Sequence, residues 1–296
     1  MKINTARISA ILATMVLAFS FAGCYDGRSD EDEKNPEGFV KVPAVSINGD
    51  ETWTPASEIF VNGRVLNLKA FYMSDHEVTQ AEWKDVMGTV PDDMAETDGN
   101  ADNNPVNCVS WYDALVYCNK RSINEGLTPC YTINGSTDPK DWGGEVPTSN
   151  DDTWNAAICD FEANGYRLPT EAEWEWAARG DGDNTVYAGS NNIDEVAWYV
   201  ENSDVKTHEV KTKKPNGYGL YDMSGNVYEW CWDRKNDDDI SSSTPATCPS
   251  SGDIRRVRSA CYLEFDPSSC EVSYRDHYYP DFFDSEHGFR VVRTAE

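Results

Sequence analysis

The chain has 296 residues, of which 52 are acidic and 25 are basic, so its formal net charge is −27. Binding of phosphate backbones needs a basic face, and this charge therefore excludes nucleic acid as an electrostatic partner. A large negative net charge is typical of a protein that stays soluble at a crowded surface. Ten Trp and fifteen Tyr predict large, irregular loops packed against a small sheet.

The first residues indicate export. Lys2 and Arg7 precede an apolar run, Ile8 to Phe21, which is too short for a membrane span and has the length of a signal-peptide core. The run ends in Phe-Ala-Gly-Cys, which resembles a bacterial lipobox, in which the cysteine becomes lipidated. We expect residues 1–23 to be a lipoprotein signal peptide and Cys24 to carry the lipid. The alternative is an ordinary cleaved signal followed by a chance cysteine.

Residues 24–38 are polar and acidic, and they predict a flexible tether to the membrane. The expected place of the protein is thus the outer membrane, facing the cell surface. Eight cysteines remain after Cys24. They permit disulfides but allow 105 connectivities, so the sequence assigns none. No Cys/His spacing suggests zinc. Cys118, on a predicted helix face, is interpreted as a buried free thiol.

The body, residues 39–296, begins with two β-rich runs and continues with three helices. The runs are Phe39 to Ile47 and Val65 to Met73. A capping-box pattern predicts the start of each helix, at Thr79, Ser110 and Thr170. Such a pattern supplies hydrogen-bond acceptors to backbone N–H groups that would otherwise lack partners.

The rest of the body is dominated by loops, with strand-like runs at Arg255 to Arg258 and Gly288 to Arg293. Few helices and many loops predict a single α+β domain with little regular secondary structure. We expect both of its ends to meet in one small sheet.

Several motifs in this body resemble one family in the same order. The most specific are Tyr166 to Ala177 (YRLPTEAEWEWA), Gly217 to Trp230 (GYGLYDMSGNVYEW) and the closing Gly288 to Arg293 (GFRVVR). They are similar to the formylglycine-generating-enzyme, or sulfatase-modifying-factor, family over about Phe39 to Arg293. The resemblance implies a C-type-lectin-like fold. It does not settle the function, because many relatives are not enzymes.

The oxidases of this family use two cysteines near the C-terminus to bind copper and the substrate thiol, and soft thiolates suit Cu(I). In this chain the preceding motif has become Ser259-Ala260-Cys261-Tyr262, Glu264 falls near the first copper cysteine, and only Cys270 lies near the second. We therefore expect no catalytic residues and no copper. A copper-dependent formylglycine-generating oxidase remains the alternative.

The resemblance also implies a calcium site. In the family, the segment matching 222–229 surrounds Ca²⁺ with oxygen ligands, which suit this hard cation. Carried over, the ligands are the side chains of Asp222 and Glu229 and the carbonyls of Gly225 and Val227. The alternative is that Asp222 caps a turn and that Glu229 pairs with an arginine.

Residues 255–290 contain a stretch of different composition, with aromatic residues among Asp and Ser. This is the chemistry of antibody paratopes, in which rigid rings supply contact area. The stretch resembles the variable regions of proteins diversified by retroelements, in which template adenines are randomised. Asn codons changed in this way encode Asp, His, Tyr, Phe or Ser, whereas Glu264, Glu271 and Glu286 would have to come from the template. The candidate ligand-binding residues are Tyr262, Leu263, Glu264, Phe265, Asp266, Asp276, His277, Tyr278, Tyr279, Asp281, Phe282, Phe283, Asp284, Ser285 and His287.

This stretch predicts the function, which is binding of an external macromolecule. Clustered exposed aromatic residues mark interaction sites. Seven acidic residues against one arginine between Tyr262 and His287 favour a protein partner with some positive charge. The alternative is an ordinary aromatic-rich loop in a non-catalytic structural relative that has one fixed partner.

Overall fold

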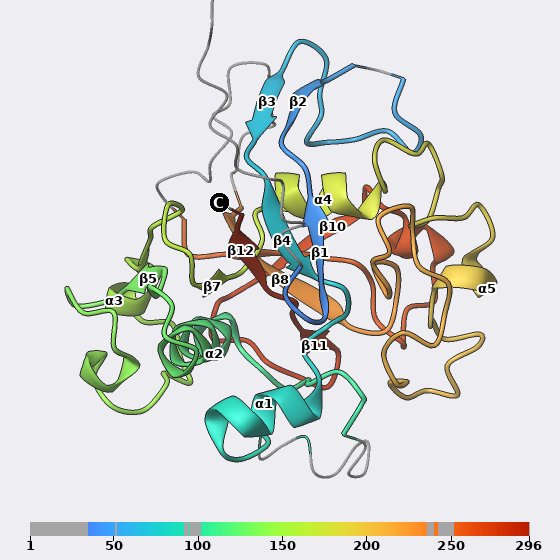
Figure 1. Cartoon of the computed structure of the whole chain (residues 1–296). Coiled ribbons are helices and arrows are strands. Elements are labelled where there is room, and N and C mark those ends of the chain that lie inside the picture. Colours follow the sequence, from blue (N-terminus) through green and yellow to red (C-terminus); the bar gives the residue numbers. More distant parts are fainter. Residues whose placement is uncertain are drawn as a thin grey trace, which may run out of the picture. The chain divides into compact units, whose positions relative to one another are not determined.

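Both ends of the folded chain lie in one small sheet. In the computed structural model, its strands follow the order β1 (Phe39–Val42), β4 (Phe71–Ser74), β12 (Val292–Thr294) and β7 (Tyr166–Arg167), and β12 is antiparallel to both of its neighbours. Figure 1 shows β1, β4 and β12 side by side at the centre, with the C-terminus next to β12. The expected meeting of the two ends is confirmed.

The structure describes residues 35–50, 52–91, 94, 102–235, 240–241 and 252–295. They belong to one compact unit, Asn35–Glu296. Within these residues, every helix is too short or too polar to traverse a lipid bilayer. The predicted signal peptide, Cys24 and most of the predicted tether lie outside the described residues.

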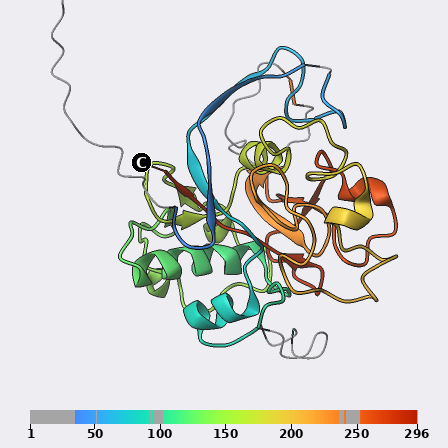
Figure 2. The same cartoon turned by 45° about the vertical axis from the view of Figure 1, so that its right-hand side comes forward.

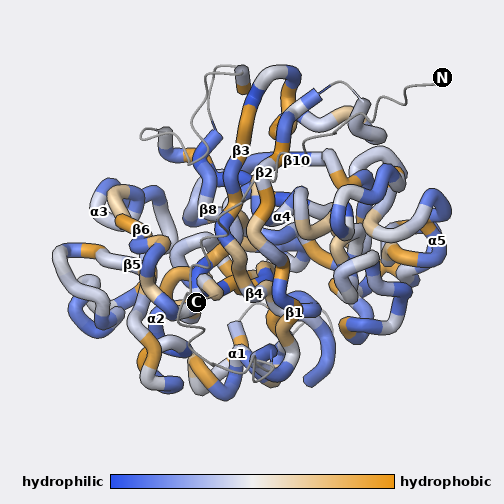
Figure 3. The backbone as a smooth tube through the Cα atoms, turned by 45° about the horizontal axis from the view of Figure 1, so that its top comes forward, coloured by the Kyte–Doolittle hydropathy of each residue, from blue (hydrophilic) through white to orange (hydrophobic). Residues whose placement is uncertain are grey.

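Each of the two β-rich runs forms two strands rather than one. The first run divides into β1 and β2 (Val45–Asn48), and the second into β3 (Val65–Leu68) and β4. Pro43 follows β1 directly and has no N–H group with which to continue a ladder. β2 and β3 pair with each other beyond this break and extend as the long hairpin seen in Figure 2. Figure 3 shows hydrophobic and hydrophilic residues mixed along it.

The three predicted helices are present, and each begins with a complete capping box. They are α1 (Gln80–Met87), α2 (Trp111–Asn124) and α4 (Glu171–Ala178), preceded by the caps Thr79, Ser110 and Thr170. α1 packs on α2, whereas α4 packs on strands β8 and β9 of a second sheet. Two one-turn helices, α3 (Asp152–Asn155) and α5 (Ile193–Val196), lie in the loops.

The second sheet carries the candidate binding residues. Its order is β10 (Arg275–Tyr278), β9 (Arg255–Arg258), β8 (Tyr228–Arg234) and β11 (His287–Gly288), and β11 runs parallel to β8. Like β2 and β3, β5 (Tyr131–Thr132) and β6 (Ile158–Cys159) form a separate two-stranded sheet. Two 3-10 turns, η2 (Pro139–Asp141) and η3 (Pro267–Cys270), complete the regular structure.

The closing run, Gly288 to Arg293, is not one strand. Gly288 ends β11 in the second sheet, and Val292 begins β12 in the first. Phe289 and Arg290 are fully buried between these strands, and the N–H of Val78 donates to the carbonyl of Phe289. The last residues therefore join the two sheets.

Candidate ligand-binding face

The candidate binding residues occupy two loops, the strand β10 and, at His287, the start of β11. We call Cys261–Asp266 the first loop and Tyr279–Glu286 the second loop. The hydroxyl of Tyr262 donates to the Oγ of Ser285 over 3.1 Å, and the thiol of Cys261 donates to the Oε2 of Glu286 over 3.0 Å. Segments about twenty residues apart in sequence thus form one continuous face.

Residues outside the two loops hold the backbone of the second loop. The N–H of Cys108 donates to the carbonyl of Asp284 over 2.8 Å, and the N–H of Trp111 donates to that of Pro280 over 3.1 Å. The side-chain amide of Asn107 donates to the carbonyl of Ser285 over 2.8 Å. Because these contacts involve loop carbonyls, loop side chains can change without breaking them.

The first loop is held in the same way. The N–H of Tyr262 donates to the carbonyl of Asn226 over 2.8 Å, and the Oγ of Ser203 donates to the carbonyl of Tyr262 over 2.7 Å. The N–H of Val200 donates to the carbonyl of Glu264 over 3.2 Å. The segment around Ser203 therefore lies against the face, although no sequence pattern linked it to a loop sixty residues away.

Four aromatic side chains on these loops are exposed. They are Phe265, Tyr279, Phe282 and Phe283, with exposed fractions of 80%, 57%, 37% and 39%. No other aromatic side chain in the described part of the chain is exposed to this degree. A gathering of all exposed rings on two adjoining loops marks an interaction surface.

Two residues expected to contact a ligand are instead buried. Tyr262 is 4% exposed and His287 is 1% exposed. The ring of His287 lies among those of Tyr228, Trp230 and Tyr278, and Phe282 packs edge-on against it. The binding assignment is therefore corrected for Tyr262 and His287, because their rings pack inward and support the loops.

Most other candidate residues are half-buried. They are Leu263, Glu264, Asp276, His277, Tyr278, Asp281, Asp284 and Ser285, while Asp266 is exposed.

Several acidic side chains give the loops their negative charge and also form hydrogen bonds that hold the loops in place. Glu264 accepts a hydrogen bond of 2.7 Å from the hydroxyl of Tyr228. Burial, followed by this carboxylate, raises the pKa of Tyr228 above its ordinary value. Asp284 lies 2.6 Å from the Nδ1 of His287. Burial opposes ionisation of Asp284, but its contacts with His287 outweigh burial and lower the pKa.

The two cysteines nearest the family's copper pair are buried thiols. Cys261 is 1% exposed and Cys270 is 0% exposed. Burial raises the pKa of Cys270 to about 12. Burial, and then Glu286, raise the pKa of Cys261 still further. The raised pKa values favour the protonated thiols, whereas the thiolate is the form that binds metal. Six cysteines of the described residues have free thiols, and they are Cys118, Cys130, Cys159, Cys231, Cys261 and Cys270. Of these, Cys118 is fully buried, as its helix face predicted.

One of the predicted calcium residues, Glu229, is paired with an arginine. The Nε and Nη2 of Arg290 each donate to Glu229 over 2.7 Å, and the indole N–H of Trp174 also donates to Glu229 over 2.7 Å. The Oδ2 of Asp222 accepts from the backbone N–H of Lys211 over 2.8 Å. Both contacts of the alternative interpretation, a turn cap at Asp222 and an ion pair at Glu229, are thus present.

One of the two predicted backbone ligands, the carbonyl of Gly225, accepts a hydrogen bond, and at Val227 the N–H group, not the predicted carbonyl, makes one. The carbonyl of Gly225 accepts from the Oγ of Ser259 over 3.2 Å. The N–H of Val227 donates to the carboxylate of Glu77 over 3.2 Å.

A third carboxyl group, Glu77, belongs to the same cluster. Its Oε2 accepts from the amide of Asn226 over 2.7 Å. Burial, together with the charges of Asp222 and Glu229, raises the pKa of Glu77 well above its ordinary value. Burial also raises the pKa of Asp222 to about 6. Glu77 and Arg290 had no assigned role in the sequence, although Arg290 lies in the closing motif shared with the family.

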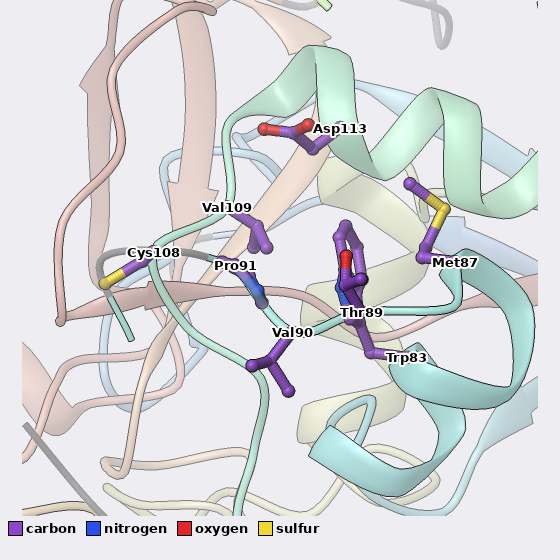
Figure 4. Close-up of a pocket in the computed structure, with 8 residues that line it drawn as sticks. All are labelled: Trp83, Met87, Thr89, Val90, Pro91, Cys108, Val109 and Asp113. Atoms are coloured by element: carbon purple, nitrogen blue, oxygen red, sulfur yellow. The ribbon is translucent and has the colours of Figure 1, made fainter. Parts of the chain in front are cut away.

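A pocket of about 240 Å³ lies beside the segment that anchors the second loop. Trp83, Met87, Val90 and Val109 line it, with Cys108 and Asp113 at its sides. Figure 4 shows that these side chains come from α1, from the segment after it, from the segment leading into α2 and from the first turn of α2. None of the candidate binding residues lines it. The binding residues lie on an exposed surface instead.

Comparison with known proteins agrees with this architecture. The sulfatase-modifying factor enzyme 1-like domain family matches residues 27–295. The chaperone protein LppX of Paenibacillus barcinonensis is 39% identical over 249 residues, which cover 77% of this chain and 82% of that protein. The formylglycine-generating enzyme of Thermomonospora curvata is 36% identical over 145 residues, 43% of this chain and 46% of the enzyme.

Among solved structures, Treponema denticola variable protein 1 superposes with a TM-score of 0.77 at 37% identity, covering 87% of this chain and 95% of that one. The chain thus has the C-type-lectin-like fold of formylglycine-generating enzymes, as its motifs predicted. It belongs to the family of sulfatase-modifying factor enzyme 1-like domains.

Proposed function

We propose that this protein is a surface-displayed lipoprotein that binds an external protein through the first loop, β10 and the second loop. The observation that carries the proposal is the gathering of all four exposed aromatic side chains of the described residues on the two loops. Exposed rings lose the free energy of burial, and they are retained where a partner covers them. The lipid at Cys24 would hold the domain at the outer membrane.

Diversification of this face is part of the proposal. The similarity to a Treponema variable protein supports it, and so does the anchoring of the loops through their backbone. The gene should then have a reverse transcriptase nearby, together with a near-copy of the coding repeat that differs at adenines.

The chemistry of the face favours a partner with basic groups around an apolar centre. Phe265 stands between Glu264 and Asp266, and Phe282 and Phe283 stand between Asp281 and Asp284. Rings supply most of the affinity in such interfaces, while charges set specificity and the rate of encounter.

Two other functions have some support. The family contains formylglycine-generating enzymes, but the burial and raised pKa values of the Cys261 and Cys270 thiols do not favour a Cu(I) site. Conversion of a sulfatase-type cysteine peptide by the purified protein with copper would restore the oxidase hypothesis. The 39% identity to a chaperone protein favours the second alternative, a fixed protein partner, which predicts an unvarying face.

The binding proposal can be tested by selection. A library would be made by randomising four positions at once, Phe265, Tyr279, Phe282 and Phe283. Each position would receive the amino acids that an adenine-randomised Asn codon encodes, and the variants would be displayed on yeast. Lysozyme, a small basic protein, is the probe. We expect lysozyme-specific clones with dissociation constants in the micromolar range or tighter, because rigid rings and small polar groups suffice for a paratope.

The matched control library randomises four exposed positions elsewhere, Val65, Ile123, Asn124 and Ile158, with the same codons. It should yield no specific clones. If both libraries yield binders equally often, or if neither does, the two loops are not a binding face.

We also propose that Asp222 gives the 222–229 segment an affinity for calcium. The contacts of the predicted ligands fit a bound calcium ion only in part. The Oδ1 of Asp222 is buried without a hydrogen-bond partner among the described residues, which favours a bound cation, whereas both oxygens of Glu229 are engaged by Arg290.

A thermal-shift measurement decides the matter. Calcium chloride at 1 mM should raise the unfolding temperature of the wild-type protein, because a ligand that binds only the folded state stabilises it. It should leave the Asp222→Asn variant unchanged, and magnesium is the control ion. An equal effect on both proteins, or none on either, would count against a calcium site here.

A further inference from the structure

Val205, a β-branched residue outside the candidate stretch, combines exposure with backbone strain. Val205 is 64% exposed, and its φ is +61°, directly after Asp204 with a φ of +55°. Left-handed backbone crowds the Cβ of an L-residue, and a β-branched residue there is an outlier. Loops usually place Gly, Asn or Asp at such positions. Valine at this position therefore lowers the stability of the folded chain.

A buried hydroxyl group ties this strained turn to the candidate face. The N–H of Val205 donates to the Oγ of Ser203 over 3.2 Å, and the same Oγ donates to the carbonyl of Tyr262 over 2.7 Å. Ser203 is fully buried, and its own carbonyl contacts the Nε2 of His208 over 2.7 Å. The turn is therefore held beside the first loop, with the valine side chain exposed.

We propose that Val205 is a constant apolar contact of the binding face, adjoining the first loop that carries Phe265. This inference rests on the proposed binding function. Strained residues persist where the surrounding structure fixes them, and they gather at ligand-binding sites. A fixed apolar side chain next to variable ones would supply affinity to every variant. It fits the same partner chemistry, a protein surface with an apolar centre and basic surroundings.

Lysozyme-binding clones from the loop library provide the test. In several independent clones, Val205→Asn should weaken lysozyme binding about tenfold, which corresponds to losing about 1.4 kcal/mol of apolar contact. The same change should raise the unfolding temperature by about 2–4 °C, because asparagine tolerates the left-handed conformation. A residue with a purely structural role would not give tighter folding together with weaker binding.

Two further variants serve as controls. Val205→Ile keeps an apolar, β-branched side chain and should retain binding. Ile158→Asn changes an equally exposed aliphatic residue on β6 and should leave binding unchanged. If selected clones bind equally well with Val205→Asn, or if this change lowers the unfolding temperature, the inference is wrong while the binding function stands. If no clone can be selected at all, the proposed function itself fails, and this inference fails with it.

Discussion

Replacing Arg290 by methionine should lower the free energy of unfolding by about 3–5 kcal/mol, the range for breaking a buried ion pair on one side. Arg290 and Glu229 are both fully buried and share two hydrogen bonds of 2.7 Å. Without the guanidinium group, Glu229 would remain buried beside Glu77 and Asp222 with no cation. Urea unfolding at neutral pH measures the loss.

The loss should shrink as the pH falls from 7 to 5. A carboxyl group whose pKa is raised by folding binds its proton more readily in the folded state, so its protonation adds stability as the pH decreases. The pKa of Asp222 is already about 6 and that of Glu77 is raised well above its ordinary value, and Arg290 lowers both. Removal of Arg290 should therefore raise both pKa values further, and the free energy of unfolding should depend more strongly on pH.

The control for this experiment is Arg293→Met in the same closing motif. Arg293 is half-buried and lies 5.8 Å from the ring of Tyr166, a cation–π contact worth about 1 kcal/mol or less. A similar loss in both variants, or a loss at Arg290 that does not depend on pH, would show that the cluster is not organised by this arginine.

Replacing Tyr278 by alanine should cost about 2–4 kcal/mol, whereas the same change at the next residue, Tyr279, should change the free energy of unfolding by no more than about 0.5 kcal/mol. The ring of Tyr278 lies 4.9 Å from that of Phe282 and 4.4 Å from that of His287. Tyr279 is 57% exposed. The two tyrosines are adjacent and chemically identical, so each is the other's control.

This pair tests the division of the face into supporting and contacting residues. Urea unfolding gives both values. If the two alanine variants were equally destabilised, the exposed rings would be part of the core and not available to a ligand.

The features that could be predicted from the sequence are those that depend on short segments of the chain. Each capping box needs only four consecutive residues, and the three helices start where Thr79, Ser110 and Thr170 indicate. The family motifs predicted the fold for a related reason, since they include residues that are buried here, such as Trp174 and Arg290.

What depends on distant contacts could not be predicted. Aromatic and polar residues are mixed without a regular period in the candidate stretch, and nothing local shows which rings face inward. His287 is enclosed because Tyr228 and Trp230 of β8 lie beside it. Val205 adjoins the face only through Ser203 and Tyr262, and a single sequence carries no signal for that contact.

The closing run has a consequence for biosynthesis. Because β12 lies between β4 and β7, and β11 pairs with β8, neither sheet can be completed until the ribosome has translated the last residues. A product shortened anywhere within the candidate stretch would lack β11 and β12 and leave the interior open. A frameshift or stop codon anywhere in the candidate stretch should therefore prevent folding of the whole domain and not only alter the loops.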